Sequence, residues 1–261
     1  MEFSYSALTD VGRVRANNED AVRLDVERGM AILADGMGGY NAGEVASALA
    51  VNLIAEELGR WLHEAAATAS LRDVRRAMEI CVDNANGVIF EGAHTHEAYA
   101  GMGTTLVMGV VHQDTFVVGH VGDSRAYRWR AGVLAQLTRD HSLLQEQIDI
   151  GLITPAEAAA SGNRNLVTRA LGVESTVLLD IQEIDVAPGD VFLLCSDGLN
   201  DMLTDHDIAR VLAGTEAPER KSQRLVDLAN ARGGRDNISV AIVKAQEAPK
   251  KSGLMAKLLR K

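Results

Sequence analysis

The stretch Ala31-Ile32-Leu33-Ala34-Asp35-Gly36-Met37-Gly38-Gly39 is the part of the chain from which the fold and the site are best predicted. Its apolar run, residues 30–34, has the length of a buried strand and is followed at once by a turn signal. The glycines let the backbone come close to whatever Asp35 holds. A strand that ends in Asp-Gly is more often an ordinary turn, because both residues favour turns. The remainder of the chain decides between a turn and a site.

Length and composition indicate a folded protein with a sizeable core. The chain has 261 residues, of which 47% are hydrophobic and 24% charged, as in ordinary globular domains. The length alone allows one large domain or two small ones. The formal net charge of -10 argues against binding to a nucleic-acid backbone, whereas clustered acids could collect divalent cations. We therefore expect no nucleic-acid partner.

The cysteines and the N-terminal residues bear on the cellular compartment. Cys81 and Cys195 lie in apolar patterns, which predicts buried free thiols and a reducing environment. The first residues lack a basic region followed by an apolar core, and no apolar run approaches the length of a membrane span. We expect a cytoplasmic protein without an integral membrane segment. The sequence does not set the oligomeric state, and a monomer is the working expectation.

Periodicity predicts strands, interrupted by helix pairs. The first 26 residues contain two predicted strands joined by a polar loop, and later strands are predicted at 104–111, 115–121, 125–129, 191–195 and 238–243. Helical spacing predicts helices at 44–63, 71–89, 205–213 and 221–231. The strands between residues 104 and 129 are expected to form an antiparallel meander. This order favours an α+β layered fold over a doubly wound sheet.

Two segments stand apart from this pattern. Residues 140–172 become helical and polar, and Thr154-Pro155-Ala156-Glu157 supplies an N-cap, a first-turn proline and a capping-box acid. We predict an inserted helical flap at about 144–167. Residues 248–261 form a basic tail beyond a domain at 1–247, with five positive charges and no acid. A solvated tail is favoured over a docking helix, because so short an isolated helix is marginal.

Three acids share one setting. Asp35, Asp197 and Asp236 each lie where an apolar strand meets a polar or glycine-containing loop, and strand ends converge. Carboxylates, with a backbone carbonyl at Gly36, make a hard-oxygen site that suits Mg²⁺ or Mn²⁺ rather than zinc. The histidine pair in His94-Thr95-His96 lacks the partners that a zinc site needs.

These residues point to phosphate-ester hydrolysis. Asp35 is placed to bridge two divalent ions that share a water, which lowers the pKa of that water towards neutrality and creates hydroxide. Arg15, in a loop with Glu19 and Asp20, could fork onto two phosphoryl oxygens. A salt bridge to either acid is the alternative, and the loop alone does not decide. Ser196 has no identifiable general base, so a local hydrogen-bonding role is predicted.

Eight motifs, in order, resemble those of one family. They are Arg-x-x-Asn-Glu-Asp at 15–20, Asp-Gly-Met-Gly-Gly at 35–39, Gly-Met-Gly-Thr-Thr at 101–105, Gly-Asp-Ser-Arg at 122–125, Thr-x-Asp-His-Ser at 138–142, Thr-Arg-Ala-Leu-Gly at 168–172, Ser-Asp-Gly-Leu at 196–199 and Asp-Asn at 236–237. Any one alone is weak. Together they resemble the bacterial metal-dependent serine/threonine phosphatases of the protein phosphatase 2C family, over roughly residues 3–245.

The resemblance implies a fold and a ligand set. The fold is a four-layer αββα sandwich, with two antiparallel β-sheets flanked by helix pairs. Two Mn²⁺ or Mg²⁺ ions are implied, with a weaker third site. The implied ligands are Asp35 as the bridge, Gly36 through its carbonyl, Asp197 and Asp236 on one metal, and Asp123 with Asp197 at the third site. Glu19 and Asp20 would orient metal-bound waters, Arg15 would hold the phosphate, and Asn237 would sit beside the metal water.

The implied activity is hydrolysis of phosphoserine and phosphothreonine in proteins by a metal-bridging hydroxide, opposing a bacterial serine/threonine kinase in signalling. A small-molecule phosphatase or phosphodiesterase, and a non-catalytic module that binds phosphoproteins, remain open on the same fold. Two positions depart from the family. Met37 stands where many eukaryotic members have a histidine proposed as proton donor, which leaves the general acid open. Ser161-Gly162 replaces a His-Pro common in bacterial relatives, which leaves flap conformation and substrate choice open.

Overall fold

Strand β3 (Met30–Met37) runs through the middle of the molecule because both of its faces are apolar. Met30, Ile32 and Ala34 pack against one layer, whereas Ala31 and Leu33 pack against another. Successive side chains of a strand point to opposite faces, so a continuous apolar run needs a layer on each side. The structure, a computed structural model, describes residues 1–39, 42–65, 67–161 and 166–248, and it supplies both layers.

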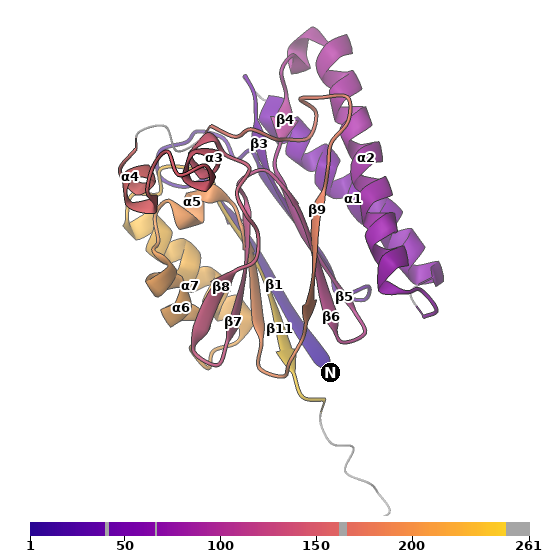
Figure 1. Cartoon of the computed structure of the whole chain (residues 1–261), viewed down its shortest axis with the longest axis vertical. Helices are drawn as coiled ribbons and strands as arrows, with labels where there is room; N and C mark the ends of the chain where they lie inside the picture. The colour runs from indigo at the N-terminus through magenta and orange to yellow at the C-terminus, as the bar shows by residue number, and fades with distance from the viewer. Residues whose placement is uncertain (40–41, 66, 162–165, 249–261) are drawn as a thin grey trace, which may run out of the picture.

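Two antiparallel sheets form the two central layers (Figure 1). The sheet that we call the β3 sheet has the order β2 (Asp20–Asp25), β3, β5 (Leu106–His112), β6 (Thr115–Val121) and β9 (Asp180–Asp185), and the short β4 (Gly103–Thr104) pairs with β3. The β1 sheet has the order β1 (Glu2–Asp10), β11 (Ile238–Gln246), β10 (Val191–Cys195), β7 (Arg125–Arg130) and β8 (Val133–Gln136). A buried apolar cluster that includes Leu33, Phe116 and Phe192 joins the sheets face to face.

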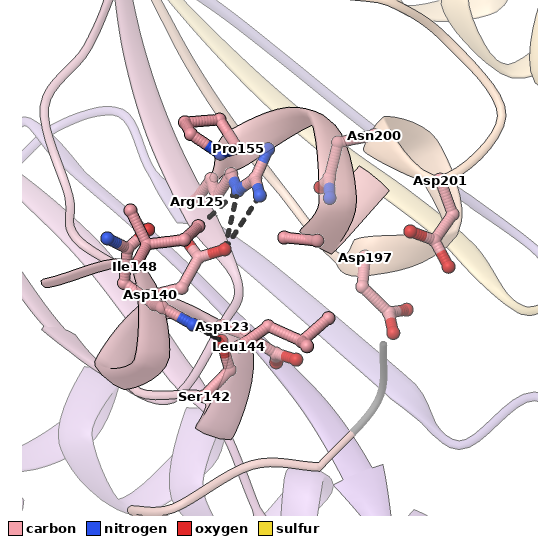
Figure 2. Close-up of a pocket in the computed structure, with 12 residues that line it drawn as sticks. Asp123, Arg125, Asp140, Ser142, Leu144, Ile148, Pro155, Asp197, Asn200 and Asp201 are labelled. Carbon is pink, nitrogen blue, oxygen red and sulfur yellow. Dashed lines mark hydrogen bonds and ion pairs between the residues drawn. The ribbon is translucent and has the colours of Figure 1, made fainter. Parts of the chain in front are cut away.

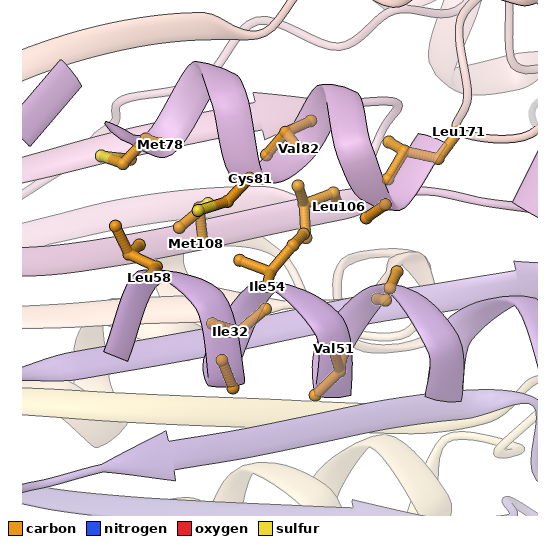
Figure 3. Close-up of a cluster of buried hydrophobic side chains, with 14 of the residues drawn as sticks. Ile32, Val51, Ile54, Leu58, Met78, Cys81, Val82, Leu106, Met108 and Leu171 are labelled. Atoms are coloured by element: carbon orange, nitrogen blue, oxygen red, sulfur yellow. The ribbon is translucent and has the colours of Figure 1, made fainter. Parts of the chain in front are cut away.

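A helix pair covers the outer face of each sheet (Figure 1). Helices α1 (Ala42–Ala65) and α2 (Leu71–Thr95) pack on the β3 sheet through aliphatic side chains, several of which appear in Figure 3. Helices α6 (Asp205–Leu212) and α7 (Pro218–Ala231) pack on the β1 sheet. The α+β, four-layer αββα sandwich is therefore confirmed. Both cysteines are buried free thiols, as predicted.

The inserted flap follows β8 and carries two short helices, α3 (Leu143–Asp149) and α4 (Pro155–Ala160). The capping box predicted for α4 is present, because the Thr154 side chain accepts from the Glu157 amide and the Glu157 side chain accepts from the Thr154 amide. Gly162, in the Ser161-Gly162 departure from the family, lies outside the described residues. So does the predicted basic tail beyond Ala248. None of the described helices combines the length and the apolar character needed to cross a bilayer.

The predicted meander is wrong in its third strand. Strands β5 and β6 pair as an antiparallel hairpin, but β7 pairs with β8 and β10 in the other sheet. The chain crosses between the sheets at Gly122-Asp123-Ser124, where Gly122 has a φ of 103°. A Gly-Asp-Ser link resembles a hairpin turn in sequence, and only the packing of the next strand tells the two apart. The crossing carries Asp123 to the end of the sandwich at which β3 ends.

The interface between the sheets yields a test of stability. Phe192 is fully buried, and its ring centroid lies 4.2 Å from that of Phe116 on the facing sheet. We expect Phe192→Ala to lower the free energy of unfolding by about 3–5 kcal/mol, because it removes a large core side chain and leaves a cavity. Denaturant titration measures this change. The control Val133→Ala, at a position 65% exposed, should change it by less than about 0.5 kcal/mol. Equal effects of the two substitutions would contradict the assigned core.

Candidate active site

Acidic side chains from both sheets meet at one end of the sandwich. Asp35 lies near the end of β3, and the strand register places Asp20 of β2 directly opposite it. Asp197 begins α5 (Asp197–Asn200), immediately after β10, and Asp236 directly precedes β11. The strand ends singled out in the sequence are thus close together, although Asp35 and Asp236 are 201 positions apart along the chain.

These residues surround a cavity of about 220 Å³, which we call the acidic pocket. Eight of the nine predicted site residues line it: Arg15, Glu19, Asp35, Gly36, Asp123, Asp197, Asp236 and Asn237. The ninth, Asp20, is buried beside it, at 9% exposure. Met37, Gly38, Thr105 and Val167 complete the lining. The pocket therefore combines five carboxylates and a backbone carbonyl with one guanidinium.

Crowding of the carboxylates disfavours their charged forms. Burial, together with the charges of neighbouring aspartates, raises the pKa of Asp35 and of Asp197 well above the usual range. Burial is also the main cause that raises the pKa of Asp20 and that of Asp123 to about 6. The pKa of Glu19 is raised, first by burial and then by Asp236. Negative charge at this site therefore carries an energetic cost that a cation would remove.

Backbone hydrogen bonds hold Asp35 in this unfavourable position. The Asp35 amide donates to Thr105 Oγ1 at 3.0 Å, and its carbonyl accepts from the Thr105 amide at 2.9 Å and from Thr104 Oγ1 at 2.8 Å. Gly36 must be glycine because a Cβ there would lie 2.1 Å from the Gly43 carbonyl oxygen at the start of α1. The strand tip is fixed by its main chain, which leaves the Asp35 carboxylate for another partner.

Only one of the two carboxylate oxygens of Asp20 accepts a hydrogen bond from the described residues. Its Oδ2 accepts from Ser196 Oγ at 2.8 Å, whereas its Oδ1 is buried and has no hydrogen-bond partner among the described residues. Ser196 Oγ in turn accepts from the Ser239 amide at 3.0 Å. Ser196 thus links the end of β10 to β2 and β11. It has the hydrogen-bonding role predicted for it, but the bonds are not local, because Asp20 lies 176 and Ser239 43 residues away along the chain. An unpaired buried carboxylate oxygen is costly, and water or a cation would satisfy it.

The Asn237 side chain is engaged with the backbone. Its Oδ1 accepts from the Glu19 amide at 2.8 Å, and its Nδ2 donates to the carbonyls of Val11 at 3.0 Å and Asn17 at 2.9 Å. These three bonds hold the Arg15–Glu19 loop against the start of β11. A catalytic role for Asn237 beside water stays a prediction, and the hydrogen bonds give it a positioning role.

Arg15 makes neither of the two local salt bridges considered from the sequence. Its Nη2 donates to Asp236 Oδ2 at 2.7 Å, across 221 positions of the chain. This hydrogen bond raises the pKa of the guanidinium, which is charged at any physiological pH in any case. Half of the Arg15 side chain is exposed, so its cation lies at the rim of the acidic pocket.

A second cavity adjoins the acidic pocket. It measures about 310 Å³, lies between the flap helices and the sheets, and shares Asp123 and Asp197 with the acidic pocket (Figure 2). One wall carries the Arg125–Asp140 ion pair, in which Arg125 Nε and Nη2 both contact the carboxylate at 2.7–3.0 Å. We call this cavity the flap pocket. Its position makes the flap a neighbour of the acidic pocket.

The donor set fits divalent cations. All of its candidate ligands are oxygens, the carboxylates raise one another's pKa, and one buried oxygen of Asp20 lacks a partner. Such sets favour Mg²⁺ or Mn²⁺. An acidic, oxygen-lined pocket at the junction of two sheets, with an arginine at its rim, defines a class of metal-assisted phosphoryl-transfer sites.

Comparison with known proteins identifies the family. The family model for protein phosphatase 2C matches residues 12–231. Protein phosphatase PhpP of Streptococcus pneumoniae is 38% identical over 249 residues, which cover 94% of this chain and 98% of that protein. The chain belongs to the protein phosphatase 2C family.

Solved structures give the same result. The serine/threonine phosphatase PstP/Ppp of Mycobacterium tuberculosis superposes with a TM-score of 0.86 at 35% identity, covering 95% of this chain and 100% of that one. A catalytic domain of serine/threonine protein phosphatase PstP in complex with two manganese ions superposes with a TM-score of 0.80 at 36% identity, covering 94% of this chain and 99% of that one.

Sequence reasoning had assigned no role to Thr104, Thr105 or the Arg125–Asp140 pair. The threonines and both members of the pair lie within quoted motifs, which was the available signal. Their partners lie 15–70 residues away along the chain. No local pattern indicates such partners, so their roles emerge only from the fold.

Asp123 gives a prediction on pH and stability. Its pKa of about 6 in the folded protein exceeds the ordinary value of 3.8, so the folded state keeps a proton that the unfolded chain loses. In the metal-free protein, the charged carboxylate therefore costs stability as the pH rises from about 4 through 6. We expect Asp123→Asn to raise the free energy of unfolding by about 2–3 kcal/mol at pH 7.5, and by almost nothing at pH 4.

Denaturant titrations of the metal-free protein at several pH values measure this difference. Asp83→Asn, at an exposed position of α2, is the control and should show no pH-dependent difference. A gain from Asp123→Asn that stayed constant between pH 4 and 7.5 would refute the assigned cause.

Proposed function

We infer that this protein is a metal-dependent protein phosphatase that hydrolyses phosphoserine and phosphothreonine. The observation that carries the inference is the acidic pocket, in which carboxylates from two sheets meet beside one arginine. Membership in the protein phosphatase 2C family, with serine/threonine phosphatases among its similar structures, supports this substrate class. A non-catalytic module on this fold would be expected to have lost metal ligands, and here all of the expected ones are present.

The proposed metal site uses the carboxylates already described. Asp35 would bridge two ions, Gly36 would contribute its carbonyl, and Asp197 and Asp236 would bind one of the ions. Glu19 and Asp20 would orient water molecules, a role that suits the unpaired Asp20 Oδ1. The two manganese ions in the PstP complex support a two-ion site. When bound, the ions supply an activated water and positive charge beside the phosphoryl oxygens. Mn²⁺ and Mg²⁺ both fit this donor chemistry.

A third, weaker ion is proposed between Asp123 and Asp197. The two carboxylates line both cavities, and the charge of Asp123 is among the causes that raise the pKa of Asp197. That effect of Asp123 on Asp197 requires the two groups to lie close together. A cation between them would relieve the repulsion.

Arg15 is proposed to hold the phosphoryl group. The hydrogen bond to Asp236 uses one of its terminal nitrogens and keeps the guanidinium over the acidic pocket. Its planar fork can donate to two phosphoryl oxygens, as arginine does in bidentate phosphate recognition. The position at the rim lets the phosphate enter the pocket while the rest of the substrate stays outside it.

The domain boundary, the compartment and the partner also belong to this proposal. Residues 1–247 would form the catalytic domain, with the flap at about 144–167, and 248–261 a basic tail. The phosphoryl groups removed here must be added by a kinase, so a serine/threonine kinase is the proposed opposing enzyme. A cytoplasmic location and a monomeric state stay predictions from the sequence.

A substrate panel tests the function. Turnover of a phosphothreonine peptide, a nucleoside monophosphate and a phosphodiester is compared with and without Mn²⁺. We expect Mn²⁺-dependent hydrolysis of the peptide, and a loss of at least about 100-fold in Asp35→Asn and Asp236→Asn with the circular-dichroism spectrum unchanged. Asp83→Asn, on the exposed face of α2, should retain activity. Faster turnover of the small molecules would instead support the small-molecule phosphatase or phosphodiesterase.

The role of Arg15 predicts a particular kinetic change. We expect Arg15→Ala to raise KM for the phosphopeptide about tenfold, with a smaller change in kcat, because the bond to phosphate exists in the bound ground state. Steady-state kinetics at saturating Mn²⁺ measure both constants. Arg13→Ala, in the same loop but outside the acidic pocket, is the matched control. If KM of Arg15→Ala equalled that of the wild type, Arg15 would not be a phosphate ligand.

A further inference from the structure

A second polar cluster lies at the base of the flap, outside both pockets. The rings of His120 and His141 stack with their centroids 4.7 Å apart, and Asp180 and Arg169 pack beside them. One nitrogen from each histidine and one Asp180 oxygen lie within 4.8 Å of one another, a spacing that would suit a metal ion. The proposed reaction does not use this cluster.

The contacts within the cluster argue against a metal ion. Arg169 Nη1 lies 2.9 Å from Asp180 Oδ1 and 3.2 Å from His141 Nε2, so a guanidinium already supplies positive charge between these groups. His120 Nε2 lies 2.8 Å from the Arg139 carbonyl, to which it donates. The cluster is therefore neutralised by the chain's own arginine, and its hydrogen bonds need another explanation.

His141 makes two hydrogen bonds with Gly122, one through its backbone and one through its ring. The His141 amide donates to the Gly122 carbonyl at 2.9 Å, and the Gly122 amide donates to His141 Nδ1 at 3.0 Å. Because the Gly122 amide is the donor, Nδ1 must be without a proton. The ring proton is then on Nε2, which faces Asp180 Oδ2 at 3.2 Å. Burial lowers the pKa of His141 and so favours this neutral ring. Asp180 thus selects the tautomer that accepts from Gly122.

Gly122 connects this bond to the acidic pocket. It directly precedes Asp123, and a Cβ at Gly122 would lie 2.8 Å from Thr105. Ser124 Oγ lies 2.7 Å from Thr105 Oγ1, the atom that accepts from the Asp35 amide. The link 122–124 is therefore held by His141 on one side and by Thr105 on the other, with Asp123 between them.

His141 also lies where the flap begins and returns. Its carbonyl accepts from the Thr168 amide at 2.8 Å, and the next residue, Ser142, forms an isolated β-bridge with Val167. Val167 itself lines the acidic pocket. The same histidine therefore contacts the end of the flap, at Thr168, through its backbone and the 122–124 link through its ring.

We propose that His141 is a positioning residue that, in the tautomer selected by Asp180, fixes the Val121–Gly122 peptide and so sets the geometry of the following residue, Asp123, relative to Asp197. The proposal rests on the proposed function for its consequence, which is that the weakest of the divalent-ion sites depends on His141. The hydrogen bond itself does not depend on that function, and it can be tested in the metal-free protein.

Two substitutions test the two ring nitrogens of His141 separately, because each keeps a polar group near only one of them. His141→Asn places an amide oxygen where Nδ1 accepts from Gly122, but it does not reach Asp180. His141→Gln places its amide near the position of Nε2, and it offers no acceptor to Gly122. If the proposal is correct, His141→Gln speeds amide hydrogen exchange at 122–123 about tenfold in the metal-free protein, and His141→Asn restores the wild-type rate.

The same variants have an effect on cation binding. Calorimetric titration with Mn²⁺ should show the weakest binding step weakened about tenfold in His141→Gln and unchanged in His141→Asn, with the tighter steps unchanged in both. Asp123→Asn identifies the weakest binding step in the titration, because the substitution removes a proposed ligand of that ion. His112→Gln is the control for loss of a buried imidazole bond, since His112 is 4% exposed and bonds the Ala69 carbonyl. It should lower the melting temperature without changing exchange at 122–123.

The outcomes are decisive for each claim. Equal exchange at 122–123 in His141→Gln, His141→Asn and wild type would overturn the positioning role. Failure of the wild type to bind Mn²⁺ would instead overturn the proposed metal site, and the exchange result would still stand. If His141→Gln does not fold, Asp180→Ala replaces it, because the Asp180 side chain is 44% exposed. This substitution releases the His141 tautomer and also breaks the ion pair with Arg169, so Arg169→Ala is measured beside it. Asp180→Ala should speed the same exchange by about threefold, and no change would overturn the role given to Asp180.

Discussion

Repulsion among buried carboxylates is the constraint on which this structure depends. Asp20 and Asp35 face each other across β2 and β3, and Asp197 and Asp236 approach them from the opposite sheet. No cross-strand pairing of like charges is favourable by itself, and burial increases the cost. The acids stay together because their main chains are held by hydrogen bonds to Thr104, Thr105 and Asn237, and because three apolar clusters fix the layers behind them. Stability from the core thus maintains an arrangement that the acids alone would not adopt.

The polar residues around the pocket divide into two groups with different tasks. Carboxylates and Arg15 present their side chains to the cavity, whereas Ser196, Asn237 and His141 turn theirs towards backbone amides and carbonyls or towards other side chains of the fold. The second group fixes the positions of the first. Such support gives the motif residues Ser196, Asn237 and His141 a structural task in the fold. It also explains why a histidine cluster with metal-like spacing can serve hydrogen bonding alone.

Much of this arrangement was predictable from local pattern, and the rest depends on packing. Asp35, Asp197 and Asp236 could be found because an apolar run that ends in an acid is visible in sequence, and the capping box of α4 is visible for the same reason. The resemblance to a known family supplied the layer order, which periodicity alone did not. The change of sheet at residues 122–124 could not be found, because a turn within a sheet and a crossing between sheets use the same residues. Strands β8 and β9 were missed because they are edge strands without a buried residue, so they lack the apolar pattern of the other strands. The residues that support the ligands could not be found either, because their hydrogen-bond partners lie far away along the chain.

The flap connects the two sheets of the molecule. The flap leaves β8, an edge strand of the β1 sheet, and the chain next enters β9, an edge strand of the β3 sheet. The flap therefore connects the two sheets of the sandwich. The predicted ligands of the acidic pocket also come from both sheets. A partner protein that bound the flap would therefore contact a segment that is connected to both sheets. Such a contact would act on the two sheets that carry the carboxylates, as well as on Val167 in the lining of the acidic pocket.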